Sequence, residues 1–289
     1  MTQSMTHNQE SLRILRRAGE RPDRSLDLGE TALALAAFNR PDLNLTPYRQ
    51  HLDEMVEQVR AAGKKENVED QLNLLRRVLV VQNKYQGEDD DEHHLAAHNL
   101  IDVITSRRGS ALALCILYLH VAHRSGWAMT ALDLSGHLLL RLSARDGQVI
   151  IDPFRSGQTC QIEEASSFFV DDDEDDVDPE LLESTPLDLY SDLLHPLSSR
   201  DLLLQLQHTI KQHYLTEHAE DSAIAILQGM ILLAPRQQEL WKELGYIQAD
   251  RGQLRAAISA LEVVKDLSSD PVPAQHADVI LRELRWRLN

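Results

Sequence analysis

The part of the chain that most constrains its fold is a strongly apolar helical segment followed directly by strand patterns. Residues 110–124 are dominated by Leu and Ala, Ser110 is suited to cap the helix, and Gly126 is typical of a residue that ends one. The runs that follow are short, carry Thr, Val and Ile, and are separated by turn residues. These three predicted strands occupy 128–134, 137–144 and 148–154. The segment predicts one long helix and a small antiparallel sheet.

Helical periodicity extends through the first ~85 residues. The clearest stripe repeats at three- and four-residue steps and consists of Leu45, Tyr48, Leu52, Met55 and Val59. Further helices are expected over 27–38, around Leu72–Leu79 and over 94–107, before the long helix. The predicted fold class is therefore α+β, with N-terminal helices beside a helix-and-sheet core.

The C-terminal part, from Asp201 onward, returns to a helical pattern and contains an internal repeat. Shifting the sequence by 34 residues aligns Ala223 with Ala257 and Leu227 with Leu261. This is the period of the TPR helix–turn–helix repeat, in which small residues allow two helices to approach closely. The other residues that fit the pattern are Tyr214, Pro235, Trp241, Leu244 and Gly245. We expect TPR-type repeats, with a final helix 274–288 in which Trp286 packs on the same continuous face.

These patterns divide the chain into three parts. Residues 1–165 form the helix-and-sheet domain with its helical cap, and 199–289 form the repeats. Residues 166–198 are predicted to be a linker, because 171–178 read DDDEDDVD and such a block repels itself.

Composition restricts the possible partners. The formal net charge is -17, and a phosphate-backbone binder needs clustered Lys and Arg, so neither nucleic acid nor an anionic membrane is expected. Two cysteines do not make a disulfide framework, and no stretch has the length of a signal peptide or membrane span. We expect a cytoplasmic protein whose charge chiefly maintains solubility, although a basic protein partner is conceivable.

Three motifs occur in a fixed order around the predicted helix and sheet. They are Arg107-Arg108-Gly109, Gly136-His137 and Ile151-Asp152-Pro153-Phe154. This order resembles the transglutaminase-like superfamily over roughly residues 25–165. Within it the chain is most similar to bacterial SirB-type proteins, which combine such a domain with TPR repeats. The resemblance implies a papain-like triad, in which a cysteine at a helix N-terminus is activated by a histidine at position 137 and an aspartate at 152.

The nucleophile is where the sequence departs from that pattern. The family cysteine lies two residues after the glycine that opens the helix and fifteen before the glycine that follows it. Both counts, from Gly109 and from Gly126, arrive at Ala111. Cys115 shares a helix face with Ala111 but lies ~6 Å further along the axis. We expect Cys115 to be a buried structural thiol, and a relocated nucleophile remains the alternative, ahead of Cys160 and Ser110.

Other polar residues near the motifs are candidates for ligand binding. Together with His137 and Asp152 they are Asn99, Arg107 and Arg108. The arginine pair is suited either to a carboxylate ligand or to the acidic turn 88–92. His94 and His98 have a spacing that suits a metal, with His93 beside them, but no third ligand follows. We therefore expect an exposed polar helix end, no metal and no cofactor.

Two functions are consistent with these features. The first is a non-catalytic interaction or regulatory protein with a degenerate transglutaminase-like domain, whose TPR helices bind a protein or peptide. The second is a cysteine-dependent amide hydrolase or acyl transferase that uses Cys115 with His137 and Asp152. The sequence leaves the partner, the substrate and the oligomeric state open.

Overall fold

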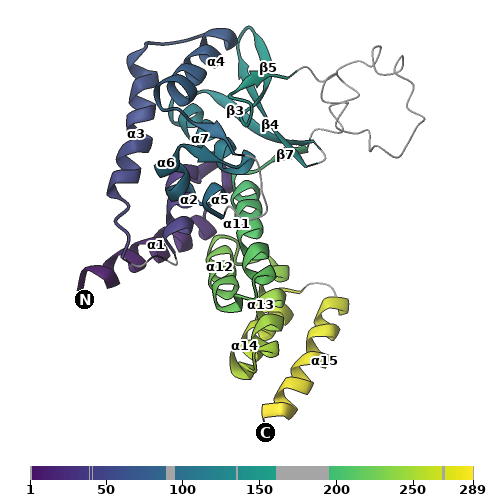
Figure 1. The fold of residues 1–289 in the computed structure, drawn as a ribbon. Helices are drawn as coiled ribbons and strands as arrows, with labels where there is room; N and C mark the ends of the chain where they lie inside the picture. Colours follow the sequence, from purple (N-terminus) through teal and green to yellow (C-terminus); the bar gives the residue numbers. More distant parts are fainter. Residues whose placement is uncertain are drawn as a thin grey trace. The chain divides into compact units, whose positions relative to one another are not determined.

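The structure is a computed structural model that describes residues 2–38, 40, 42–88, 95–134, 136–160, 195–268 and 271–288, without the side chains of 2–8 and 271–276. The elements before the main sheet are α1 (Thr2–Glu20), η1 (Asp23–Ser25), α2 (Leu28–Ala37), α3 (Thr46–Ala61), α4 (Val68–Arg76), the π-helical η2 (Arg77–Gln82), β1 (Gln86–Gly87), α5 (Leu95–His98), α6 (Leu100–Ser106), β2 (Arg108–Gly109) and α7 (Ala111–Arg124) (Figure 1).

The elements that follow α7 are strands and then helices. The strands are β3 (Ala128–Leu134), β4 (His137–Ala144), β5 (Gly147–Asp152), β6 (Gln158–Thr159) and β7 (His195–Leu197). The helices are α11 (Ser199–Thr216), α12 (Glu220–Leu233), α13 (Gln238–Asp250), α14 (Leu254–Leu267) and α15 (Pro271–Leu288). A helical fold with a small antiparallel sheet is thus confirmed, and β3, β4 and β5 lie where the sequence predicts strands.

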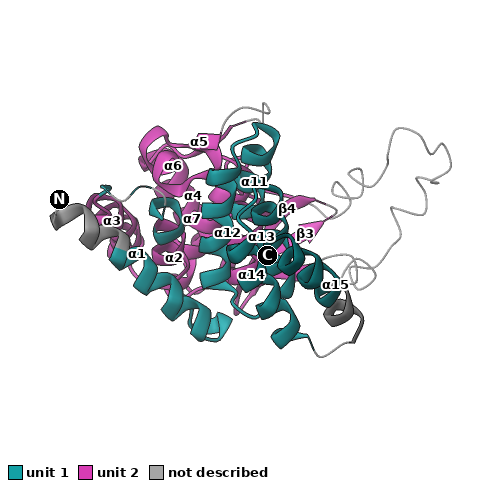
Figure 2. Ribbon diagram, turned by 90° about the horizontal axis from the view of Figure 1, so that it is seen from below, with its two compact units in different colours: residues 1–26, 34–43, 207–289 teal, residues 27–33, 44–206 magenta. Residues whose placement is uncertain are grey.

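The chain forms two compact units, coloured separately in Figure 2. Unit 1 comprises Met1–Leu26, Ala34–Leu43 and Gln207–Asn289, and unit 2 comprises Asp27–Leu33 and Asn44–Leu206. The N-terminal helix therefore belongs to the same unit as the last helices of the chain. The predicted domain boundaries at 165 and 199 stay a prediction.

The main sheet of unit 2 has the strand order β6-β5-β4-β3-β7, with every neighbouring pair antiparallel. Side chains alternate between its two faces. One face carries a small cluster against which Cys160 packs, formed by Leu132, Leu134, Leu139 and Ile150. The residues between them point to the other face, where Ala131, Leu140, Leu142 and Ile151 are at most 1% exposed. Both faces are thus covered where the strands are longest.

Helix α7 is the interior helix of unit 2 and contacts α3, α4, α5, β3 and β4. Every residue from Ala113 to Ala122 is buried. Gly126 follows the helix with a φ of 81°, a conformation that glycine adopts without strain. The predicted start and end of this helix are confirmed.

The helices of unit 1 pack in sequence, with α13 against α14 and α14 against α15. The residues aligned by the 34-residue shift are all inside, since Ala223, Leu227, Ala257 and Leu261 are at most 1% exposed. Gly245 lies so close to α14 that an added Cβ would stand 2.8 Å from Leu261 Cγ.

The expectation that Trp286 packs on this face is wrong, because its side chain is 79% exposed. The stripe of α15 that joins the core consists of Ala277, Leu281 and Leu284. Trp286 follows Leu284 by two positions, which is about 200° around a helix.

Helix α1 packs against α12 within unit 1. The buried stripe of α1 consists of Ser11, Leu15 and Ala18. At Gly19 the two helices approach so closely that an added Cβ would lie 2.2 Å from the backbone oxygen of Leu232. Real Cβ atoms do not tolerate that distance, so the α1–α12 contact depends on glycine at this position.

We predict that Gly19→Ala lowers the free energy of unfolding by about 1–3 kcal/mol, because the methyl group meets backbone that cannot rotate away. The matched control is Gly229→Ala on α12, where the nearest atom to the new Cβ is Leu35 Cδ2 at 3.5 Å. Because that contact is an ordinary one, replacing this helical glycine by alanine should raise the free energy of unfolding by about 0.5–1 kcal/mol. Chemical denaturation measures both, and equal effects would contradict the packing described.

Candidate functional site

The first turn of α7 is where the superfamily pattern places a nucleophile. Ser110 is 5% exposed and caps the helix, since its Oγ accepts a hydrogen bond from the Ala113 N–H at 3.4 Å. The Ser110 N–H itself donates to the Ala97 carbonyl at 2.9 Å. Ala111 is the first residue of the helix and is half-buried. This turn therefore offers a methyl group and an engaged hydroxyl.

Cys115 lies one turn further along α7 and is 0% exposed. Burial raises the pKa of its thiol well above the ordinary value, and the nearby Asp152 carboxylate raises it further. The thiolate is the nucleophilic form of cysteine, so both effects hold Cys115 in its unreactive state. The expected position of this thiol in the core agrees with the geometry.

Tyr118 follows Cys115 by one further turn of α7 and is 1% exposed. Burial raises the pKa of its hydroxyl, and the hydroxyl has no hydrogen-bond partner among the described residues. An added Cβ at Gly157 would lie 2.9 Å from that oxygen. Tyr118 and Gly157 thus close the interior between α7 and the end of β5.

His137 and Asp152 lie on neighbouring strands. His137 begins β4, is exposed and pairs with Leu134. The β4–β5 register pairs Leu140 with Ile151, and alternation then places His137 and Asp152 on the same face of the sheet. The strands therefore bring these two residues to one end of one face.

The Asp152 carboxylate also has a structural role. Its Oδ1 accepts hydrogen bonds from the Phe154 N–H at 2.8 Å and the Arg155 N–H at 3.2 Å. Oδ2 lies 3.6 Å from Arg155 Nε. These contacts form a tight turn directly after β5, a common use of Asp at the first position of a turn.

Asn99 and the arginine pair lie at the two ends of α6 and in β2, just before α7 in the chain. Asn99 caps α6, since its Oδ1 accepts from the N–H groups of Ile101 at 3.1 Å and Asp102 at 3.4 Å. Arg107 ends α6 in a left-handed conformation with φ 66°. Arg108 lies in β2, whose pairing with β1 joins it to Gln86. Asn99 thus determines where α6 begins, and Arg107 determines where it ends.

The side chain of Arg107 enters a cluster that sequence reasoning missed. Its Nη1 donates to the Tyr85 hydroxyl at 2.6 Å and contacts His51 Nε2, which lies 2.9 Å from the same hydroxyl. The guanidinium carbon lies 5.0 Å from the centre of the Tyr85 ring. Burial raises the pKa of Tyr85 to about 12, while burial and then Arg107 lower the pKa of His51 to about 4. Arg107 is therefore engaged inside the fold; most of the acidic turn 88–92 lies outside the described residues.

The histidine and cysteine alternatives have different outcomes. The expectation that His98 lies at an exposed helix end is wrong, because it is 6% exposed. It belongs to α5, a single helical turn in which the Ala97 carbonyl accepts a hydrogen bond from the Ser110 N–H. His93, His94 and the acidic run 171–178 lie outside the described residues.

Cys160 is half-buried against the sheet cluster around Leu139. Among the residues that the structure describes, no group of three His, Cys, Asp or Glu is arranged to hold a metal.

A charged pocket of about 240 Å³ lies among α2, α3 and α7, far along α7 from Ala111. Its lining residues are Asp27, Glu30, Arg49, Leu52, Asp53, His120 and Arg124. Arg49 binds Glu30 through two of its nitrogens, and Arg124 lies within 3.6 Å of both Asp27 and Asp53. His120 is 5% exposed, and burial lowers its pKa. Because these residues are scattered over almost 100 positions, no local pattern could have revealed the network.

The sequence profile of the transglutaminase-like superfamily matches residues 46–208, more than half of the chain. The chain belongs to this superfamily. Its matched part begins with α3 and contains α7, the main sheet and the positions of Ala111, His137 and Asp152. No helix in the described part of the chain has the length and apolar character to cross a bilayer.

Two curated relatives are UPF0162 proteins of Xylella fastidiosa. The protein of strain Temecula1 is 25% identical over 242 residues, which cover 83% of each chain. That of strain 9a5c is 26% identical over 230 residues, covering 78% of this chain and 79% of the relative. Among solved structures, the chain is similar to menin, in a crystal structure described as revealing its binding site for the Mixed Lineage Leukemia protein. The TM-score is 0.44 at 9% identity, covering 90% of this chain and 70% of menin, which is too weak to inform fold or function.

We predict that iodoacetamide labels Cys160 in the native protein and leaves Cys115 unlabelled until the protein is unfolded, because only Cys160 is partly accessible. Peptide mass mapping distinguishes the two sites, and Cys160→Ser serves as the control that removes the accessible thiol. Rapid labelling of native Cys115 that disappears in His137→Ala would show that the thiol is activated, against this geometry.

A second prediction concerns pH. The unfolded chain protonates His51 near pH 6.5 and the folded chain only near pH 4, so stability falls as pH decreases between these values. Allowing for the partial exposure of the ring, we expect His51 to account for about 1–2 kcal/mol of that loss. Urea unfolding at several pH values should give a flatter profile for His51→Gln than for wild type. The control Val81→Ser, which changes an exposed side chain without a titratable group, should leave the profile unchanged, and a wild-type profile for His51→Gln would contradict the prediction.

Proposed function

We propose that this protein is a non-catalytic member of the transglutaminase-like superfamily that binds a protein partner through its C-terminal helices. The observation that carries the proposal is the alanine at position 111, where the superfamily pattern has its cysteine. A methyl group cannot attack an acyl carbon, and the neighbouring Ser110 hydroxyl serves as a cap.

The state of Cys115 supports the absence of thiol chemistry. A substrate carbonyl must come within about 3 Å of a nucleophile, and the sulfur of Cys115 is enclosed on all sides. Its raised pKa acts in the same direction. The contacts of Asn99, Arg107 and Asp152 support a structural role for these residues, which a protein without catalytic activity would also need. In this proposal His137 and Asp152, with the arginine pair, line at most a vestigial ligand site.

The binding part of the proposal rests on the repeat. The 34-residue period, the buried alanines at corresponding positions and the close approach at Gly245 support TPR-type pairing of α13 with α14, as in SirB-type proteins. Stacked helical repeats form extended surfaces on which helices or extended peptides can dock. The exposed side of α13 presents Tyr246, which is 36% exposed, with the Lys242 ammonium 5.7 Å from its ring centre.

The remaining features complete the proposal. We place the transglutaminase-like domain within 1–165, a linker at 166–198 and the repeats at 199–289. The high negative charge favours a protein partner over nucleic acid or membrane, in the cytoplasm.

The test uses the full chain as bait in cell extract, because α1 belongs to the same unit as the repeats and a fragment beginning at residue 199 would expose α12. We expect a captured protein to be lost when Tyr246→Ala is combined with Lys242→Glu. The control Val81→Ser, which changes a 69% exposed side chain in unit 2, should retain it. Assays of amide hydrolysis should give no activity above buffer. Turnover abolished by Cys115→Ser, or capture unaffected by the α13 variant, would overturn the proposal.

A further inference from the structure

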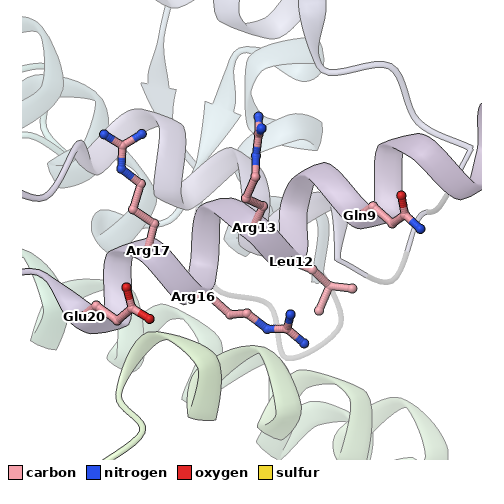
Figure 3. Close-up of a pocket in the computed structure, with 6 residues that line it drawn as sticks. All are labelled: Gln9, Leu12, Arg13, Arg16, Arg17 and Glu20. Atoms are coloured by element: carbon pink, nitrogen blue, oxygen red, sulfur yellow. The ribbon is translucent and has the colours of Figure 1, made fainter.

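Helix α1 presents a row of arginines on the side opposite its buried stripe. Arg13, Arg16 and Arg17 are exposed, whereas Ser11, Leu15 and Ala18 are buried. The row surrounds a surface hollow of about 510 Å³ lined by α1 alone, through Gln9, Leu12, Arg13, Arg16, Arg17 and Glu20. Figure 3 shows Arg13 and Arg17 extending from one side of the helix and Arg16 from the other side in that view.

The charges of this row are not used within the described part of the chain. None of these three arginines forms an ion pair or hydrogen bond with a described residue, although Glu20 lies four positions after Arg16 and three after Arg17. Like charges at these spacings destabilise an isolated helix by a few tenths of a kcal/mol per pair. A chain of net charge -17 has carboxylates in excess, so three guanidinium groups that have no partner among the described residues point to an acidic ligand.

The arrangement specifies the chemistry of that ligand. Arginine forks bind carboxylates through two parallel hydrogen bonds. Arg13 and Arg17 are four positions apart, about 6 Å along the helix, which is the spacing of carboxylates at positions i and i+4 of another helix. Half-buried Leu12, four positions before Arg16, adds an apolar contact at the edge.

We propose that the α1 arginine row binds an acidic amphipathic helix of a partner protein, with carboxylates four residues apart on one face. A nucleic acid is the weaker candidate, because it requires a longer positive surface and its many charges are opposed by the rest of this chain. This surface is separate from the α13 face of the proposed function, so either can fail without the other.

The experiment measures binding of a fluorescent alanine-based helical peptide with glutamates at i and i+4 and leucines beside them. Its control peptide has the same composition in scrambled order. By fluorescence anisotropy we expect the full chain to bind the patterned peptide about tenfold or more tightly than the scrambled one, with affinity falling as salt rises. Arg13→Glu combined with Arg17→Glu should weaken binding by at least that factor.

Two controls separate this effect from misfolding or net charge. Arg24→Glu with Arg236→Glu changes the net charge equally at exposed positions outside the row and should alter affinity by less than about twofold. A peptide with lysines replacing the glutamates should bind the Arg13/Arg17 reversal variant and not wild type. Three results would overturn the proposal: no binding of the patterned peptide up to about 1 mM, the same affinity for this peptide in the Arg13/Arg17 and Arg24/Arg236 variants, or tighter binding of a single-stranded RNA oligonucleotide than of this peptide.

Discussion

Burial of α7 is the constraint on which the rest of unit 2 depends. The helix has packed elements on several sides, and Ser110 fixes its first turn through a side-chain cap and a backbone bond to Ala97. With the start fixed, each position on α7 has one environment. Position 111 lies at the edge, position 115 in the core and position 118 against Gly157. Moving the thiol of Cys115 to the environment of position 111 would require the helix to rotate or slide, which would disrupt every contact along its buried length.

The polar residues around α7 are as important for folding as for any chemistry. Asn99 begins α6 and Arg107 ends it, while Arg107 also bridges Tyr85 and His51. Asp152 makes the turn that brings Phe154 beside Gly87, where an added Cβ would lie 2.7 Å from the ring. Loss of these residues would leave buried donors and acceptors unsatisfied, which costs about 1–3 kcal/mol each. Asn99, Arg107 and Asp152 therefore have structural roles that do not depend on catalysis.

The sequence predicts local structure here better than it predicts partnerships. The period and end residues of 110–124 define α7, and alternation defines β3, β4 and β5, because these signals are local. Asn99 divides the predicted helix 94–107 into α5 and α6, since its side chain competes for the N–H groups of the next turn. The cluster of His51, Tyr85 and Arg107 joins residues separated by up to 56 positions, and the sequence around any one of them does not predict contact with the other two.

The candidate site shows the same limit. Positions 111, 137 and 152 follow from the order of motifs, and the register of β4 and β5 places the last two on one face. The burial of Cys115 could be anticipated from its position one turn further along a helix dominated by Leu and Ala. The burial of His98 could not, because it depends on the packing of a one-turn helix under Ser110. The large apolar ring of Trp286 predicts burial, but the stripe of α15 that meets α14 consists of Ala277, Leu281 and Leu284, so Trp286 is exposed.

The contact between α1 and α12 also has a consequence for synthesis. A ribosome adds about 5–20 residues per second, so roughly 10–40 s separate the appearance of Gly19 from that of Leu233. Throughout that interval the stripe of α1 that is buried in the folded protein has no α12 to cover it. Packing of α1 in unit 1 therefore waits until most of the chain has been made, although α1 is the first helix to leave the ribosome.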